Sequence, residues 1–216
     1  MKYIIMADGE GKRWNNYMGV PKHLIELNGE RLIDRTVRLL KEVGIEDIWI
    51  TTHDERLHVS GINIYEPTNN LEEIDKFLSN EPIWTKNVLF VYGDVYYTED
   101  AIKAMVSCPM INDFKFCGRF GAHKYTKKDF GEIFGLKFLG DSGATKVREG
   151  CKAVHRYLES GGHRGSGWEL YKAMHNAEDM VAHQYFGNFE EINDLTDDFD
   201  CPSEYEDFIN NYKKAK

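Results

Sequence analysis

The sequence is short of long apolar runs and of basic residues, and each shortage excludes a class of protein. No stretch approaches the roughly 18 apolar residues that a membrane-spanning helix needs. The 27 Lys and Arg residues are outnumbered by 36 Asp and Glu residues, which gives a net charge of −9. A general nucleic-acid binder carries a basic excess instead. We therefore expect neither a membrane nor a nucleic acid as partner.

Cysteine is also scarce, and the histidines show no metal-binding spacing. Cys108, Cys117, Cys151 and Cys201 include no C-x-x-C pair, and neither H-x-x-H nor H-E-x-x-H occurs. A zinc site is therefore not expected. The N-terminus enters an apolar run after its second residue and shows no signal-peptide h-region or cleavage site. Reduced cysteines without a signal peptide predict a cytoplasmic protein.

Strand-like and helix-like apolar patterns alternate along the chain, which is typical of an α/β fold. The 216 residues predict a single domain, residues 1–216, with a nucleotide-binding half (1–110) and an acceptor-binding half (111–216). We expect one Rossmann-like, mixed and mostly parallel sheet flanked by helices. Strands are expected at 2–6, 48–52, 62–65, 88–92 (central), 114–120 and 133–138, with the last ones between 181 and 198. Helices are expected at 32–43, 71–78, 99–106, 145–160, 167–176 and 202–213.

A glycine loop directly after the first expected strand is the most informative feature. Gly9 and Gly11 follow the apolar run Tyr3–Met6, and glycine lets backbone N–H groups approach phosphate oxygens closely. A dinucleotide fingerprint would need a third glycine where Trp14 stands, and a P-loop would need Ser or Thr where Arg13 stands. The remaining pattern is G-x-G-x-R, with Pro-Lys eight residues later. It predicts a polyphosphate site served by two cations.

This pattern resembles the nucleotidyltransferase (NTP transferase) family, whose signature is Leu-Ala-(Ala/Gly)-Gly-x-Gly-x-Arg, then Pro-Lys-x-Leu and Gly-x-x-(Leu/Ile)-Ile. The counterparts here are Met6–Arg13, Pro21–Leu24 and Gly29–Ile33. The resemblance implies a GT-A-like fold in which Arg13 holds the departing phosphates and Lys22 stabilises charge near the α-phosphate. The loop residues that would contact the nucleotide are Ala7, Asp8, Gly9 and Gly11. Asp8 departs from the pattern, because its carboxylate would repel a triphosphate unless it turns away or meets a metal.

Two acidic segments are expected to bind magnesium. Asp94 follows Gly93 at the end of the apolar run 88–92, and ligands of open α/β sheets bind at the carboxyl ends of strands. A carboxylate there can hold a hard cation on nucleotide phosphates. The resemblance implies that Asp94 is a Mg²⁺ ligand and that Gly93 adjoins the nucleotide. The segment 197–205 resembles the family motif Asp-x-Asp-Thr-Pro-Glu-Asp, which makes Asp200 the second ligand and Asp198 the next candidate. A turn or helix-cap role is the alternative for Asp94 and Asp200.

The segment Glu66–Asn70 follows the third expected strand. Asn69 and Asn70 offer both donors and acceptors, which suits a base edge or a ribose hydroxyl. Thr-Asn-Asn in this place resembles the small cytidylyltransferases that act on phosphocholine. A plain turn followed by a helix cap explains the same residues equally well.

No motif marks the acceptor site. The cations considered for an acceptor phosphate are Arg119, His123, Lys124, Lys146, Arg148, His163 and Arg164. Most are expected on the surface, and the glycine-bracketed pair of His163 and Arg164 is the most suggestive. Trp168 would suit a cationic headgroup, or a core position at the start of a helix.

These residues predict attack by an acceptor phosphate on the α-phosphorus of a nucleoside triphosphate, with release of pyrophosphate. Positioning and charge neutralisation suffice, because the acceptor is already ionised. CTP and a small phosphorylated alcohol or amine are favoured, while sugar 1-phosphates with UTP, GTP or dTTP stay open. The product would feed polysaccharide, lipid or nucleotide-sugar synthesis, and a homodimer is compatible with the chain. The alternatives are a metal-dependent GT-A-type glycosyltransferase and a catalytically silent nucleotide-binding protein, which Asp8 would suit.

Overall fold

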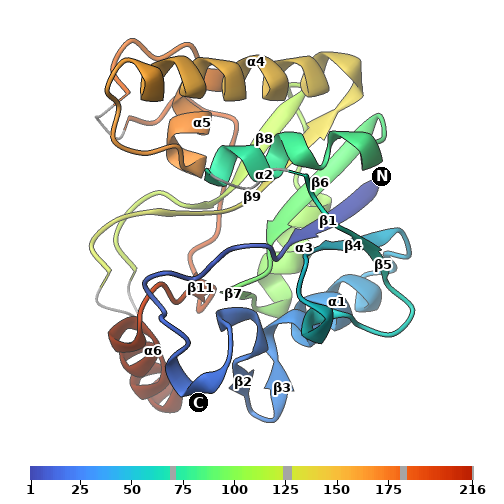
Figure 1. Ribbon diagram of the computed structural model, residues 1–216, viewed down its shortest axis with the longest axis vertical. Coiled ribbons are helices and arrows are strands. Elements are labelled where there is room, and N and C mark those ends of the chain that lie inside the picture. Colours follow the sequence, from blue (N-terminus) through green and yellow to red (C-terminus); the bar gives the residue numbers. More distant parts are fainter. Residues whose placement is uncertain (69–71, 124–127, 181–183, 216) are drawn as a thin grey trace.

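A seven-stranded sheet forms the centre of the protein (Figure 1). The computed structural model describes residues 1–68, 72–123, 128–180 and 184–215. The sheet order is β10-β8-β9-β6-β1-β4-β5. Its strands are β1 (Lys2–Met6), β4 (Ile48–Thr51), β5 (Asn63–Tyr65), β6 (Asn87–Tyr92), β8 (Phe114–Arg119), β9 (Glu132–Leu139) and β10 (Phe189–Glu191). Two short antiparallel pairs lie outside it: β2 (Glu26–Leu27) with β3 (Glu30–Arg31), and β7 (Val95–Tyr96) with β11 (Asp197–Asp198).

Helices cover both faces of this sheet (Figure 1). One face packs against α2 (Glu73–Ser79), α4 (Gly140–Glu159) and α5 (Gly167–Met174). The other face packs against α1 (Leu32–Glu42) and α3 (Glu99–Ser107). The last helix, α6 (Pro202–Ala215), joins a third small core with β2, β7 and Trp14 from the loop after β1. The chain therefore returns at its C-terminal end to the glycine loop near its start.

The two innermost apolar strands explain the layering. Ile4 packs with α2 and α4, whereas Ile5 packs with α1 and α3, and both are fully buried. A strand covered on both faces must be apolar at successive positions, because burial of each large apolar side chain stabilises the fold by about 1.5–3 kcal/mol. The central place expected for residues 88–92 is confirmed, since β6 lies in the middle of the sheet order.

The sheet is mixed and mostly parallel, as expected. β1 pairs in parallel with β4 and β6, β4 with β5, and β8 with β10, whereas β9 is antiparallel to β6 and β8. From β1 the chain crosses through α1 to β4, and after β5 it crosses back through α2, on the opposite face, to β6. Such a reversal opens a crevice at the carboxyl ends of the strands involved.

The structure differs from the expected elements mainly where the sequence lacks large apolar residues. The helix expected at 145–160 begins at Gly140, because its first turns pack through the small residues Gly143 and Ala144. A Cβ on Gly143 would lie 2.4 Å from the backbone oxygen of Asp113, so this position requires glycine. A helix turn that packs through glycine and alanine has no large apolar residues whose spacing would indicate a helix. The two-residue strands β2, β3 and β7 were not expected, whereas β11 lies within the range 181–198 expected for the last strands. Among the described helices, none has a stretch long and apolar enough to cross a bilayer.

The close contact at Gly118 leads to a prediction about the stability of the fold. It lies at an irregularity in the β8/β9 register, where a Cβ would sit 2.2 Å from the Glu132 carbonyl oxygen. Because the facing strand cannot withdraw without breaking its ladder, Gly118→Ala should lower the free energy of unfolding by about 1–3 kcal/mol in urea titrations. Gly121→Ala is the matched control, since nothing lies within 4 Å of its Cβ position, and it should change stability by less than about 0.5 kcal/mol. Equal stability of the two variants would contradict the steric argument.

Candidate active site

A cleft of about 280 Å³ opens at the carboxyl ends of β1 and β6. The first half of the chain lines it with the glycine loop, Lys22 and Asp94. The second half adds a further set of acidic residues, Glu132, Asp198 and Asp200. The residues predicted for phosphate and metal binding from distant parts of the sequence therefore meet at the crevice that the sheet topology creates.

The glycine loop is anchored by Trp14, the residue that stands where a dinucleotide fingerprint would have glycine. Gly11 has a φ of 60°, in the left-handed region that favours glycine, and its carbonyl accepts from the backbone N–H groups of Trp14 and Asn15 at 2.9 and 3.1 Å. The Trp14 ring is buried, and its Nε1–H donates to the carbonyl of Val20 at 2.8 Å. Trp14 thus anchors the glycine loop in the protein interior, while residues 9–11 of the loop line the cleft.

Lys22 lies between two of the predicted metal ligands. A 3₁₀ turn at Lys22–Leu24 positions it, and its side chain is 9% exposed. Its Nζ is 2.5 Å from Oδ2 of Asp94 and 3.2 Å from Oδ1 of Asp200. Burial opposes the charged form, but the surrounding carboxylates prevail and raise the pKa of the Lys22 ammonium above its usual value. Arg13 is mostly exposed, and its Nη2 lies 2.5 Å from Oδ2 of Asp200.

Asp94 reaches this position because residue 93 is glycine. The Gly93 N–H donates to the carbonyl of Met6 at 2.8 Å, and a Cβ on Gly93 would lie 2.9 Å from the Cβ of Ala7. Only glycine allows the β6 end to approach β1 this closely. Burial disfavours the Asp94 carboxylate, but Lys22 outweighs it and holds the pKa of the carboxyl below its usual range.

The acidic residues of the second half form a compact group. Carboxylate oxygens of Glu132, Asp198 and Asp200 lie within 4.8 Å of one another. Burial and the neighbouring Asp198 raise the pKa of Glu132 well above its ordinary value. Glu132 was not predicted from the sequence, because no motif surrounds it and only the antiparallel pairing of β9 with β6 and β8 brings it here. These donors are hard oxygen ligands, the kind that Mg²⁺ prefers.

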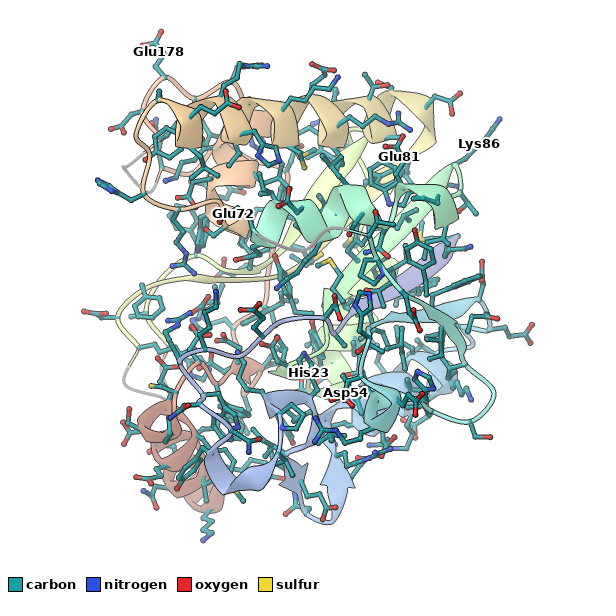
Figure 2. The ribbon with its side chains drawn as sticks, viewed as in Figure 1. His23, Asp54, Glu72, Glu81, Lys86 and Glu178 are labelled. Atoms are coloured by element: carbon teal, nitrogen blue, oxygen red, sulfur yellow. The ribbon has the colours of Figure 1, made fainter. Side chains whose placement is uncertain are left out.

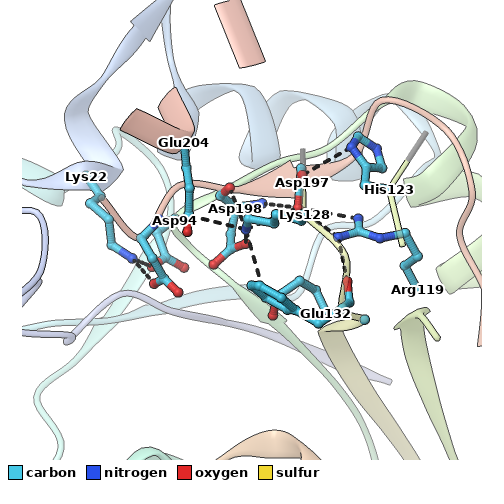
Figure 3. A network of polar contacts seen from close by, with 12 residues as sticks. Lys22, Asp94, Arg119, His123, Lys128, Glu132, Asp197, Asp198 and Glu204 are labelled. Carbon is cyan, nitrogen blue, oxygen red and sulfur yellow. Dashed lines mark hydrogen bonds and ion pairs between the residues drawn. The ribbon is translucent and has the colours of Figure 1, made fainter. Parts of the chain in front are cut away.

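A buried charge network supports this acidic group (Figure 3). The carboxylate of Asp197, fully buried, lies 3.4 Å from Nη1 of Arg119, 3.2 Å from Nδ1 of His123 and 3.4 Å from Nζ of Lys128. Lys128 also pairs with Asp198. Burial opposes the charge on Lys128, but Asp198 and its acidic neighbours raise the pKa of the ammonium. The network fixes the segment that carries Asp198.

The structure separates the seven acceptor cations. Arg119 and His123 were two of the candidates for an acceptor phosphate, but they are buried against Asp197 instead. On the surface, Lys146 pairs with Asp113 at 3.1 Å, and Arg148 pairs with Glu81 at 2.6 Å. His163 is exposed, and Arg164 lines the cleft. Lys124 lies outside the described residues, as do Asn69 and Asn70.

Trp168 has the core role that the sequence left as one of two options. Its side chain is buried, its Nε1–H donates to the carbonyl of Gly131 at 3.0 Å, and its ring stacks on Phe189 with centroids 5.9 Å apart. The ring therefore fixes α5 to the sheet and does not face the cleft wall.

Asp8, the departure from the family signature, turns toward the loop after β4. Its Oδ1 accepts from the backbone N–H of His53 at 2.8 Å, and the ring Nδ1 of the same histidine lies 3.0 Å from this oxygen. The carboxylate is therefore held by His53, which limits the repulsion that an anion beside a phosphate loop would otherwise cause.

The Asp197 network generates a second stability prediction. Asp197→Ala would leave Arg119 and Lys128 buried without their shared carboxylate, and breaking one side of a buried ion pair costs about 3–5 kcal/mol. Thermal or urea unfolding should show a loss of this size. Asp113→Ala removes the exposed pair with Lys146 and should cost no more than about 1 kcal/mol. A loss at Asp197 no larger than that at Asp113 would show that the network does not stabilise the fold.

Comparisons with known proteins agree with this geometry. Residues 3–112 match the family model of the MobA-like NTP transferase domain. Many solved structures resemble the chain, among them the three that follow, and at these low identities they support the fold. The inositol-1-phosphate CTP transferase from T. maritima has a TM-score of 0.61 and 16% identity, covering 98% of this chain and 96% of that chain. The CTP:phosphocholine cytidylyltransferase LicC from Streptococcus pneumoniae has a TM-score of 0.57 and 18% identity, covering 95% and 96%. HddC from Yersinia pseudotuberculosis, in complex with GMP-PN, has a TM-score of 0.56 and 15% identity, covering 100% and 99%.

No curated protein sequence matches the chain. The matched family segment spans half of the protein and includes the glycine loop, Lys22 and Asp94. The chain therefore belongs to the family of MobA-like NTP transferase domains, and it is a nucleotidyltransferase.

Proposed function

We propose that this nucleotidyltransferase moves a nucleoside monophosphate from CTP to a small phosphorylated acceptor and releases pyrophosphate. The acceptor would be a phospho-alcohol, a phospho-amine or a sugar phosphate. The observation that carries the proposal is the position of Lys22, a buried ammonium within 3.2 Å of both Asp94 and Asp200 and beside the glycine loop. Two of the structures that resemble the chain are CTP transferases, which supports CTP as the nucleotide.

In the proposed reaction the chain neutralises charge and positions both substrates. Lys22 keeps its proton at neutral pH because of its raised pKa, so it can stabilise the charge that develops at the α-phosphate. Arg13, exposed at the mouth of the loop, would hold the departing β- and γ-phosphates. Both cations are paired with carboxylates, so phosphate oxygens would replace Asp94 and Asp200 as their partners. No base is required, because the acceptor phosphate is already ionised.

The carboxylates around the cleft fit magnesium. Asp94 and Asp200 would hold the ion, and Asp198 and Glu132 provide further oxygen donors beside Asp200. Magnesium keeps several waters and takes one or two protein carboxylates together with substrate phosphates, which agrees with such an open acidic site. A bound ion would neutralise charge on the phosphates.

The acceptor would enter from the side of α2 and α5. Lys76 on α2 and Arg164 before α5 are the basic residues of the cleft wall on this side, and we propose that they receive the acceptor phosphate. The alternative of a silent nucleotide-binding protein depended on Asp8, and the contact of this residue with His53 removes that argument.

A pyrophosphate-release assay tests the proposed reaction. With magnesium, CTP and a panel of phosphocholine, phosphoethanolamine and sugar 1-phosphates, the protein should release pyrophosphate with at least one acceptor. Lys22→Ala should reduce turnover by roughly 100-fold or more, the scale of losing one charge-stabilising donor. Lys103→Ala, an exposed lysine paired with Glu99 on α3, is the matched control and should keep full turnover. Near-normal turnover of Lys22→Ala would overturn the role of this residue.

Metal binding gives a separate prediction. Asp94→Asn and Asp200→Asn should each weaken Mn²⁺ binding in the presence of CTP by about 10-fold or more, because each removes a charged ligand. Electron paramagnetic resonance of free Mn²⁺ measures this directly, without turnover. Comparison with Asp198→Asn decides which C-terminal aspartate is the second ligand, and Asp141→Asn on the exposed start of α4 serves as the control. Unchanged binding in Asp94→Asn would exclude that residue as a ligand.

A further inference from the structure

A second cavity lies on the other side of the glycine loop. Its volume is about 620 Å³, and its walls are the loop residues 7–10 and the segment 52–57 that follows β4. It shares Gly9, Glu10 and His23 with the cleft that holds Lys22. A triphosphate over the loop with its α-phosphate at Lys22 would therefore extend its nucleoside into this cavity, which has the size of a small-molecule site.

The imidazole of His53 is an exposed hydrogen-bonding group in the wall of this cavity. Asp8 accepts from the His53 backbone N–H, and both of its carboxylate oxygens lie 3.0 Å from the ring Nδ1. A carboxylate only accepts, so in the neutral imidazole the proton lies on Nδ1 and Nε2 keeps its lone pair. Within the described residues no partner is found for Nε2, and the side chain is 53% exposed.

Two of the other charged residues in the cavity wall neutralise each other. Arg56 pairs with Asp54 at 2.5 Å. His23 is buried between the two cavities, and burial lowers its pKa to about 4, so the ring is neutral. Figure 2 labels His23 and Asp54, which line the same cavity. Among the described residues, the Nδ1 atom of His23 has no hydrogen-bond partner. The cavity therefore suits a neutral polar group such as a nucleobase.

We infer that His53 determines nucleobase specificity, with its Nε2 accepting a hydrogen bond from an exocyclic amino group of the base. Asp8 is the positioning residue, because it fixes the tautomer that leaves Nε2 as an acceptor. This inference rests on the proposed function. It explains how an acidic residue in the phosphate loop contributes to binding: the carboxylate orients an imidazole and does not contact the triphosphate.

Two pairs of nucleotides differ in the exocyclic group that the His53 Nε2 atom would contact. Cytosine carries an amino group where uracil carries a carbonyl oxygen, and adenine differs in the same way from hypoxanthine. A carbonyl oxygen facing the Nε2 lone pair makes no hydrogen bond, and a site built around a hydrogen bond discriminates strongly against a ligand that lacks it. CTP against UTP and ATP against ITP therefore test the amino group, and the two pairs distinguish a pyrimidine from a purine source.

Calorimetric binding of these four magnesium nucleotides to the full chain tests the inference. The wild type should bind the amino nucleotide of one pair about 10-fold more tightly, or more, than its oxo counterpart. His53→Phe keeps a ring but no acceptor, and His53→Gln offers either a donor or an acceptor, so both should bring this ratio toward one. His58→Phe, an exposed histidine of the same loop outside the cavity, should leave the ratio unchanged.

Asp8→Asn tests the positioning role of Asp8 through the position of the His53 ring proton, which a purely structural role would leave unchanged. An amide can also donate, so the His53 ring should shift its proton from Nδ1 toward Nε2, which proton–nitrogen correlation spectra of the imidazole report. The nucleotide ratio should fall in parallel.

Three outcomes would overturn the inference. An unchanged ratio in His53→Phe and His53→Gln would show that the ring does not read the base. An equal loss for both members of a pair would place Nε2 on the ribose. In either case pyrophosphate release by the wild type would leave the proposed function intact. Absence of binding by all four nucleotides, together with absence of pyrophosphate release, would overturn both proposals.

Discussion

The buried ammonium of Lys22 is the interaction on which the site depends. An unpaired buried charge is prohibitively costly, so the fold has to bring carboxylates to it, and it does so from β6 and from the segment before α6. This requirement joins two distant parts of the sequence and explains why Gly93 and the third small core are needed. The same charges are those that phosphate and metal would use. The ion pairs that stabilise the fold and the binding of substrate therefore compete for one set of side chains.

The buried charge network around Asp197 has a different role from the ion pairs of Lys22. Asp197 is fully buried among Arg119, His123 and Lys128, and Lys128 extends the network to Asp198. Adjacent residues of β11 thus point to opposite sides, one toward a closed internal network and the other toward the cleft. Because the closed network is shielded from solvent, it would hold the carboxylates of the cleft in place while they change partners in the proposed reaction.

The sequence predicted those parts of the fold that depend on local pattern. The apolar runs placed β1 and β6, and the glycine loop with Pro-Lys located the cleft. Glu132 could not be found, because its place depends on which strands β9 pairs with, and no local pattern records that pairing. Arg119 was misjudged for a related reason: a cation looks the same in sequence whether it faces solvent or a buried aspartate. The roles of Asp94 and Asp200 as metal ligands stay predictions.

Asp8 shows how a departure from a family pattern becomes intelligible through its neighbours. In isolation an acid in a phosphate loop disfavours an anionic ligand by direct repulsion. Held by His53, the carboxylate has two hydrogen bonds that fix its direction, and it orients a ring whose other nitrogen faces the second cavity. The contact turns the carboxylate toward His53, and by our inference the oriented ring would discriminate between bases. A residue that disfavours phosphate binding could thus favour recognition of the base, because its partner lies in the loop that follows the neighbouring strand β4.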